Sequence, residues 1–140
     1  MTDLVLHVIP YDGVGGVEQA AASAEGATAD GFVLRRLFVF PNVADRRGRF
    51  ASFNPFALWS AAGRVAASRP KLIIVSLWRS AIVSWLARLR GCRAPRVLFL
   101  HNARDAHLAD RIATRLTSHH AAAIWADSQA TISQRLPIRN

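Results

Sequence analysis

The feature that most constrains the fold of this chain is a regular alternation of short apolar runs with helical segments. The apolar runs, which predict strands, lie at 4–9, 33–40, 72–77, 97–100 and 122–126. Helices are expected from Gly16 to Glu25, from an Asn54-Pro55 cap to Pro70, from a Ser80 cap to Gly91, over Leu108, Ile112 and Leu116, and from Ser128 to Leu136. Strands that alternate with helices at this spacing predict one α/β domain over 1–140, with a parallel sheet of about five strands covered by helices on both faces.

Such a sheet also predicts where a ligand binds. In an open, doubly wound parallel sheet of the Rossmann type, ligands lie beyond the carboxyl ends of the strands, where the strand order reverses. With the common order 3-2-1-4-5, the loops after the first and fourth strands flank that point. Gly15, Gly16 and His101 are therefore expected to face one crevice.

Composition and charge exclude several classes of protein. Of the 140 residues 51% are hydrophobic and 19% are charged, which excludes a disordered chain. The single cysteine, Cys92, provides neither a disulfide framework nor a zinc quartet, and the first residues lack a signal-peptide pattern, so a cytoplasmic protein is expected. The longest apolar stretch, 72–89, is interrupted by Arg79 and passes from β-branched residues to helical spacing, which favours a strand and a helix over a membrane span.

A glycine-rich turn follows the first strand, within HVIPYDGVGGVEQAAAS at 7–23. A strand, a glycine turn and a helix start form a phosphate-binding shape. A dinucleotide site fits poorly, because Glu18 replaces the third glycine of G-x-G-x-x-G and the second strand ends LFVFPN, without an acid for a ribose hydroxyl. The alternative without a ligand is that Gly13, Gly15 and Gly16 only permit a tight turn.

Three segments resemble the N-terminal domain of glycosyltransferase family 4, whose members are retaining enzymes of the GT-B fold. LVLHVIPYDGVGGVEQAAAS contains the family's strand and its Gly-Gly-x-Glu turn, at Gly15, Gly16 and Glu18. RLRGCRAPRVLFLHN resembles the family's helix, turn and strand ending in histidine, and AAAIWADSQATISQRL resembles a later segment. The three follow one another in the family's order from residue 4 to about residue 136.

The resemblance implies transfer of a sugar, with retention, from a nucleotide-sugar donor to a glycan or lipid-linked acceptor. It implies that His101, the catalytic residue, hydrogen-bonds a sugar hydroxyl or the acceptor. The substrate-binding residues implied are Gly15, Gly16, Glu18, Arg79, Asn102 and Ser128. Where the family often has a histidine after the third strand, this chain has Trp78 and Arg79.

The same resemblance carries expectations about cofactors and domains. The leaving phosphate accepts the proton of the acceptor in such enzymes, so neither a protein nucleophile nor a metal or other cofactor is expected. Family members have a second, donor-binding domain, with which this chain would form the complete enzyme. The 140 residues are therefore expected to be the acceptor-side half, inactive alone.

A basic and aromatic stretch at 42–59 suggests a membrane-facing surface. The predicted membrane or acceptor surface comprises Arg46, Arg47, Arg49 and Phe50. Such a stretch suits anionic headgroups, which would place the protein peripherally at the inner face of the membrane. The equally weighted alternative is that Phe56 and Trp59 belong to a helix core and the arginines are solvated.

Other readings of the sequence are weaker. Nucleic acid is disfavoured, because no binding module is recognisable. The spacing of His101, Asp105 and His107 matches no standard metal site, and His7, inside the first strand, is expected to be structural. The rival function is a stand-alone flavodoxin-like binding or signalling module without transferase activity.

Overall fold

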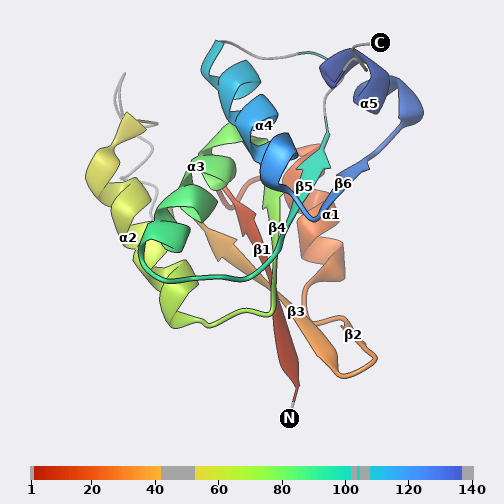
Figure 1. Cartoon of the computed structure of the whole chain (residues 1–140). Helices are drawn as coiled ribbons and strands as arrows, with labels where there is room; N and C mark the ends of the chain where they lie inside the picture. Colours follow the sequence, from red (N-terminus) through yellow and green to blue (C-terminus); the bar gives the residue numbers. More distant parts are fainter. Residues whose placement is uncertain (1, 42–52, 102–103, 105–107, 137–140) are drawn as a thin grey trace.

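The computed structural model describes residues 2–41, 53–101, 104 and 108–136. Its strands are β1 (Asp3–Ile9), β2 (Thr28–Ala29), β3 (Phe32–Phe38), β4 (Leu72–Ser76), β5 (Arg96–Leu100) and β6 (Ala123–Ala126). Its helices are α1 (Gly16–Ala24), α2 (Pro55–Ala67), α3 (Leu77–Leu89), α4 (Leu108–His120) and α5 (Gln129–Arg135). All strand pairs are parallel except β2–β3, so the predicted α/β, Rossmann-like class is confirmed (Figure 1).

The strand order differs from the predicted one. Neighbouring strands follow the order β2-β3-β1-β4-β5-β6, so β4 lies beside β1 and not beyond β3. In terms of the five predicted strands this is 2-1-3-4-5, the other common doubly wound order. The physical reason is burial: β4 is buried from Ile73 to Ser76 and needs a central place, whereas β3 carries Arg35 and Arg36 and lies near the edge. The order therefore reverses between β1 and β4.

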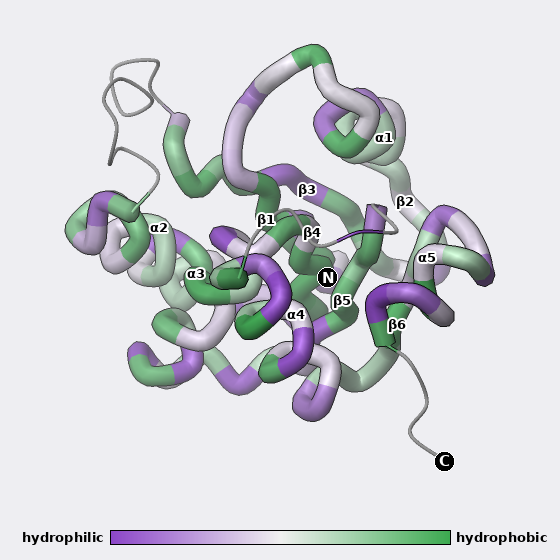
Figure 2. The backbone as a smooth tube through the Cα atoms, turned by 90° about the horizontal axis from the view of Figure 1, so that it is seen from above, coloured by the Kyte–Doolittle hydropathy of each residue, from purple (hydrophilic) through white to green (hydrophobic). Residues whose placement is uncertain are grey.

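Helices cover both faces of the sheet, as predicted. The helices α2, α3 and α4 lie side by side on one face and α1 lies on the other (Figures 1 and 2). The main core comprises alternate residues of the central strands and the facing residues of α2 and α3, among them Leu6, Val8, Ile73, Val75, Leu98, Leu100, Leu58, Ala61, Val65 and Val83. Figure 2 shows β1, β4 and β5 as the hydrophobic centre of the molecule.

Two predicted helix starts, at Asn54 and Ser128, are confirmed, and each has a side-chain cap. The side chain of Asn54 accepts hydrogen bonds from the backbone N–H groups of Phe56 and Ala57 at the start of α2. The hydroxyl of Ser128 accepts one from the N–H of Thr131 at the start of α5. Each cap satisfies backbone donors that the first turn of a helix otherwise leaves unpaired.

The predicted cap at Ser80 is wrong. The helix α3 begins at Leu77, immediately after β4, and Ser80 lies buried inside it. Leu77 has a φ of 68°, in the left-handed region that non-glycine residues seldom occupy. This conformation turns the chain from strand to helix without a loop, so Ser76 stands directly at the start of α3.

The short strand β2 was not predicted. It pairs antiparallel with β3 through a tight hairpin whose central residues, Asp30 and Gly31, have φ values of 49° and 79°. Positive φ at both central residues is typical of a type I′ turn, for which Asp-Gly is a favoured sequence. The Asp-Gly pair was therefore the signal for this edge strand.

The predicted helix over 108–116 is confirmed, but its apolar repeat faces outwards. Leu108, Ile112 and Leu116 are 69%, 50% and 55% exposed. The buried residues of α4 are Asp110, Ala113, Thr114 and Thr117. The helix is therefore attached to the molecule through its small and polar side.

The apolar stretch 72–89 forms β4 followed by α3, as predicted. Among the helices within the described ranges, none combines the length and the apolarity that crossing a membrane requires.

Candidate functional site

Three polar side chains lie on the face of the sheet that α1 covers. In the strand register His7 is opposite Ile74, and Ser76, two residues further along β4, is opposite Phe99. His101 follows two residues after Phe99. Since residues two apart share a face of a sheet, His7, Ser76 and His101 form a diagonal across β1, β4 and β5 towards the strand ends.

Ser76 links the two histidines. Its Oγ lies 2.8 Å from Nε2 of His7 and 3.0 Å from Nε2 of His101. His7 is 4% exposed and Ser76 is completely buried, whereas His101 is partly exposed and its ring lies 4.0 Å from that of Phe99. A chain of hydrogen bonds thus extends from the interior of the sheet to its carboxyl edge.

Burial keeps both imidazoles neutral at pH 7. Desolvation, with smaller effects of His101 and Arg36, lowers the pKa of His7 to about 4. Desolvation also lowers the pKa of His101, while the carboxylates of Asp127 and Glu18 act in the opposite direction. Glu18 of α1 therefore lies within electrostatic reach of His101 at the end of β5, so these two predicted site residues come to the same edge.

The backbone conformation of the turn after β1 does not require glycine, because other residues can adopt it. Gly15 is the N-cap of α1, with φ −74° and ψ 167°, and none of Gly13, Gly15 and Gly16 lies in the left-handed region. A Cβ added at Gly16 would meet no atom within 4 Å, and one at Gly15 would meet only the side chain of Glu18. A tight turn therefore does not explain these glycines, and the space beside Gly16 is open.

Arg79 brings a cation to the place where the strand order reverses. Its guanidinium lies 4.4 Å from the ring of Trp78 and 5.5 Å from that of Tyr11, the residue that follows β1 and Pro10. Burial lowers the pKa of Arg79, but a guanidinium still remains charged at neutral pH. Two aromatic rings thus hold a partly buried positive charge near the turn after β1.

Ser128 caps α5, and its neighbour Asp127 lies within electrostatic reach of His101. The hydroxyl of Ser128 caps α5 and lies 3.0 Å from Oγ1 of Thr131. Asp127 accepts a hydrogen bond of 2.8 Å from the same Thr131 hydroxyl, and its carboxylate partly offsets the lowering of the His101 pKa by burial. Sequence reasoning named Ser128 but missed the electrostatic role of Asp127.

Several predicted residues lie outside the described part of the chain. These are Asn102 and the predicted membrane or acceptor surface of Arg46, Arg47, Arg49 and Phe50. In the described end of the same stretch, Phe56 and Trp59 are 83% and 46% exposed, so the alternative that they belong to the helix core is wrong. With Pro55, Leu58 and Leu86 they line an apolar groove on α2 and α3.

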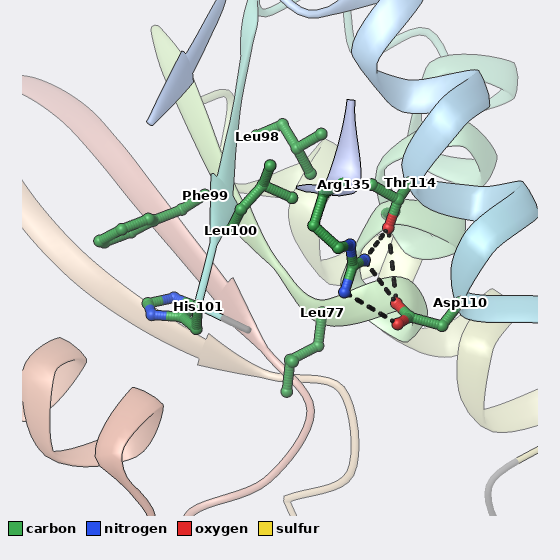
Figure 3. Close-up of a pocket in the computed structure, with 9 residues that line it drawn as sticks. Leu77, Leu98, Phe99, Leu100, His101, Asp110, Thr114 and Arg135 are labelled. Atoms are coloured by element: carbon green, nitrogen blue, oxygen red, sulfur yellow. Dashed lines mark hydrogen bonds and ion pairs between the residues drawn. The ribbon is translucent and has the colours of Figure 1, made fainter. Parts of the chain in front are cut away.

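A second polar cluster lies on the other side of β5. Nη1 of Arg135 lies 3.2 Å from Oδ2 of Asp110 and donates to the Arg104 carbonyl at 2.9 Å, and Nη2 donates to the Thr114 hydroxyl at 2.7 Å. Figure 3 shows this cluster on one side of the strand and the His101 ring on the other. A cavity of about 10 Å³, room for one water, lies between the cluster and the strand end. This cluster fastens α5 to α4 and stays apart from the His101 ring.

Sequence reasoning also missed Ser76 and treated His7 as structural. The signal was present in the alternation, since His7 falls between Leu6 and Val8, which point into the main core. With the predicted strand order, however, the strands of His7 and Ser76 were not neighbours, so their contact could not be foreseen.

Within the described residues, no three His, Cys, Asp or Glu side chains gather closely enough to hold a metal ion. The chain matched no model of a known protein family and no curated protein. The edge of the sheet combines the partly exposed imidazole of His101, which the buried Ser76 contacts from below, with the guanidinium of Arg79 and the exposed start of α1. Such groups suit a ligand that carries both hydroxyls and negative charge.

Proposed function

We propose that these 140 residues form the acceptor-side half of a retaining family 4 glycosyltransferase, which transfers a sugar from a nucleotide-sugar donor to a glycan or lipid-linked acceptor. The observation that carries the proposal is that Glu18, at the start of α1, and His101, directly after β5, lie at the same edge of the sheet, close enough for the Glu18 carboxylate to act on the pKa of His101. Glu18 belongs to the Gly-Gly-x-Glu segment and His101 ends the second segment that resembles this family. Residues 83 positions apart in sequence thus lie at the edge where a doubly wound sheet binds ligands.

The start of α1 and Arg79 would face the donor diphosphate. The amides of Gly15 and Gly16 lie at a helix N-terminus, where the helix dipole favours an anion, and open space lies beside Gly16. The carboxylate of Glu18 lies next to Gly15, so a diphosphate enters only when Glu18 turns towards the sugar hydroxyls. The guanidinium of Arg79 adds positive charge at the same edge.

In this proposal His101 orients the sugar. Its ring donates to, or accepts from, a sugar hydroxyl while the bond between the sugar and the diphosphate breaks. The leaving phosphate takes the proton of the acceptor on the same face, so no side chain of this chain acts as a nucleophile. A donor-binding domain would close the other side of the crevice, and without it we expect no turnover.

The acceptor would approach from a membrane surface on the cytoplasmic side. The exposed rings of Phe56 and Trp59 continue the basic stretch that contains Arg46, Arg47 and Arg49. Aromatic side chains beside arginines suit the boundary between lipid headgroups and acyl chains.

A stand-alone binding or signalling module is the second candidate. The observation that favours it is the strand order, because 2-1-3-4-5 is also the order of flavodoxin-like modules, which bind their ligands at the same switch point.

The test uses the native gene product that contains these residues, a panel of labelled nucleotide sugars, and membranes or glycans as acceptors. We expect transfer of label from one donor, and a His101→Ala variant about 10- to 100-fold slower, the equivalent of one hydrogen bond to a charged or polar ligand group. His120→Ala, at the exposed end of α4, is the matched control. Ligand binding without transfer from any donor would favour the second candidate, and wild-type turnover by His101→Ala would contradict the assignment of the site.

A further inference from the structure

Ser76 has two imidazole partners but only one hydrogen to donate. Its Oγ lies within hydrogen-bonding distance of Nε2 of both His7 and His101, at 2.8 and 3.0 Å. The side chain is completely buried between them. A buried hydroxyl that does not donate its hydrogen costs about 1–3 kcal/mol, so the hydrogen must point to one of the two nitrogens.

The number of hydrogens then determines the protonation of both imidazole rings in this chain of hydrogen bonds. If Ser76 donates to the Nε2 of one ring, that nitrogen must be unprotonated, and the ring carries its proton on Nδ1. The other ring faces a lone pair of Oγ, so its Nε2 must be protonated in order to donate. While both rings are neutral, they therefore hold opposite tautomers.

We propose that His7, Ser76 and His101 form a hydrogen-bonded relay in which the tautomer of His7 inverts each time His101 gains or loses a proton, so that His101 keeps an Nδ1–H donor in both states. His7 and Ser76 are then positioning residues that act through His101. The relay deepens the proposed function and rests on it only for the identity of the ligand that meets His101.

In the neutral state the hydrogen bonds are donated in the direction from His7 through Ser76 to His101. His101 is partly exposed at the end of β5, so an Nδ1–H on its ring can be solvated or meet a ligand, whereas the ring of His7 is buried; in the neutral state the proton of His101 therefore stands on Nδ1. Nε2 of His101 then accepts from the Ser76 hydroxyl, and Ser76 accepts from Nε2–H of His7. No group in this state is charged.

In the charged state the hydrogen bonds are donated in the opposite direction, from His101 through Ser76 to His7, and the three side chains hold one more proton. His101 then carries protons on both nitrogens and donates from Nε2 to Ser76. One proton shifts along each hydrogen bond, from Nε2 of His7 to Ser76 and from Ser76 to Nε2 of His101, and the added proton is bound at Nδ1 of His7, so the Ser76 hydroxyl now donates to the unprotonated Nε2 of His7. His7 itself stays neutral, because burial, His101 and the cation of Arg36 on β3 all disfavour a charge there.

The consequence for a ligand is a donor that does not depend on pH. His101 offers Nδ1–H to an acceptor oxygen, such as that of a phosphate or a sugar, whether it is neutral or charged. An isolated histidine has no such constraint, because its neutral ring exchanges freely between the two tautomers.

The test is a pH titration of the ¹⁵N-labelled 140-residue chain, in which long-range ¹H–¹⁵N spectra report the protonation of each ring nitrogen. We expect His7 on Nε2–H and His101 on Nδ1–H at high pH. As His101 gains its second proton, His7 should change to Nδ1–H at the same midpoint and remain neutral until about pH 4. Equal tautomers in the two rings, or a His7 that does not change while His101 titrates, would overturn the relay.

Two variants sharpen the result. Ser76→Ala should abolish the coincident change of His7, while Ser80→Ala, which removes another fully buried serine hydroxyl, should leave it intact. If Ser76→Ala does not fold, the wild-type titration still decides, because it needs no variant. None of these spectra depends on transferase activity, so failure of the relay and failure of the proposed function are separate results.

Discussion

Arg135 at the end of α5 and Asp110 in the first turn of α4 form an ion pair whose side chains are only 6% and 7% exposed. The pair joins α4 and α5 through residues that are 25 positions apart in sequence, and the guanidinium also donates to the Thr114 hydroxyl and the Arg104 carbonyl. A buried ion pair adds little net stability over an apolar pair, but loss of one partner leaves a buried charge.

Replacement of one partner should therefore destabilise the domain strongly. For Asp110→Ala we expect the free energy of unfolding in urea to fall by about 3 kcal/mol, because the Arg135 charge loses its carboxylate in a buried place. Asp12→Ala removes the exposed partner of Arg36 and should cost about 0.5 kcal/mol or less. Equal losses in the two variants would contradict the structural role of the buried pair.

Replacement of glycine by valine should destabilise the fold where the glycine has a positive φ and leave stability nearly unchanged where it does not. Gly26 has φ +77°, so Gly26→Val should cost at least about 1–2 kcal/mol through backbone strain. Gly16→Val adds a side chain into open space and should leave the urea midpoint close to wild type while it lowers nucleotide-sugar transfer by the native gene product. Wild-type transfer by Gly16→Val would show that no ligand approaches the start of α1.

Stability should fall as the pH falls from about 6.5 to about 4, and His7 should account for much of it. The pKa of His7 is lowered to about 4 in the folded state, so in this window the unfolded chain binds the proton and the folded chain does not. The contribution is complete above pH 6.5 and amounts to roughly 3 kcal/mol lost by pH 4. Burial of His101 acts in the same direction.

Urea unfolding at several pH values from 7.5 to 4.5 measures this dependence. His7→Gln keeps a polar group that can contact Ser76 but removes the titration, so its stability should decline less steeply than that of wild type. Ser118→Ala, which removes a non-titrating hydroxyl from α4, should retain the wild-type slope. Identical slopes for His7→Gln and wild type would mean that His7 titrates normally in the folded protein.

The rings of α2 should contribute to binding of anionic vesicles. Phe56 and Trp59 are exposed, so Phe56→Ser and Trp59→Ser should reduce co-sedimentation with anionic vesicles and change the melting temperature little. Leu116→Ser removes an equally exposed apolar side chain from α4 and is the control. A similar loss in all three variants would indicate unspecific adhesion of apolar surface.

The arginines of the stretch 42–59 should contribute to binding of anionic vesicles through their positive charge. Replacement of Arg46, Arg47 and Arg49 by Ser should lower binding to anionic vesicles, and binding by the wild type should fade as salt shortens the screening length to about 3 Å near 1 M. Binding that is unchanged in this triple variant would contradict the membrane-facing role of the stretch.

The sequence predicted the elements of this fold better than their arrangement. Alternation of apolar runs and helical segments located five of the six strands and all five helices of the described residues, because burial on one or two faces produces a periodic pattern in the sequence. The order of the strands in the sheet produces no periodic pattern in the sequence. It depends on which strand can be buried on both faces, and the contrast between LIIVS and the arginines of β3 was the available clue.

The candidate site was predicted in part for the same reason. Gly15, Gly16, Glu18 and His101 lie at strand ends or helix starts, positions that any doubly wound sheet brings to one edge. The contacts of Ser76 with two histidines depend on β1, β4 and β5 being neighbours, which the wrong order concealed. The start of α3 was missed because a leucine at positive φ violates the usual preference for glycine in a tight turn.

The direct passage from β4 into α3 limits how chains with this architecture can diverge. Insertion of one residue after Ser76 would rotate α3 by about 100° about its axis and turn Trp78 and Ala81 away from their buried contacts with α4. Length changes are therefore excluded at this junction, although it borders the place where the strand order reverses. Changes of loop length at this edge of the sheet are therefore better tolerated in the segments after β1 and β5 than at the β4–α3 junction.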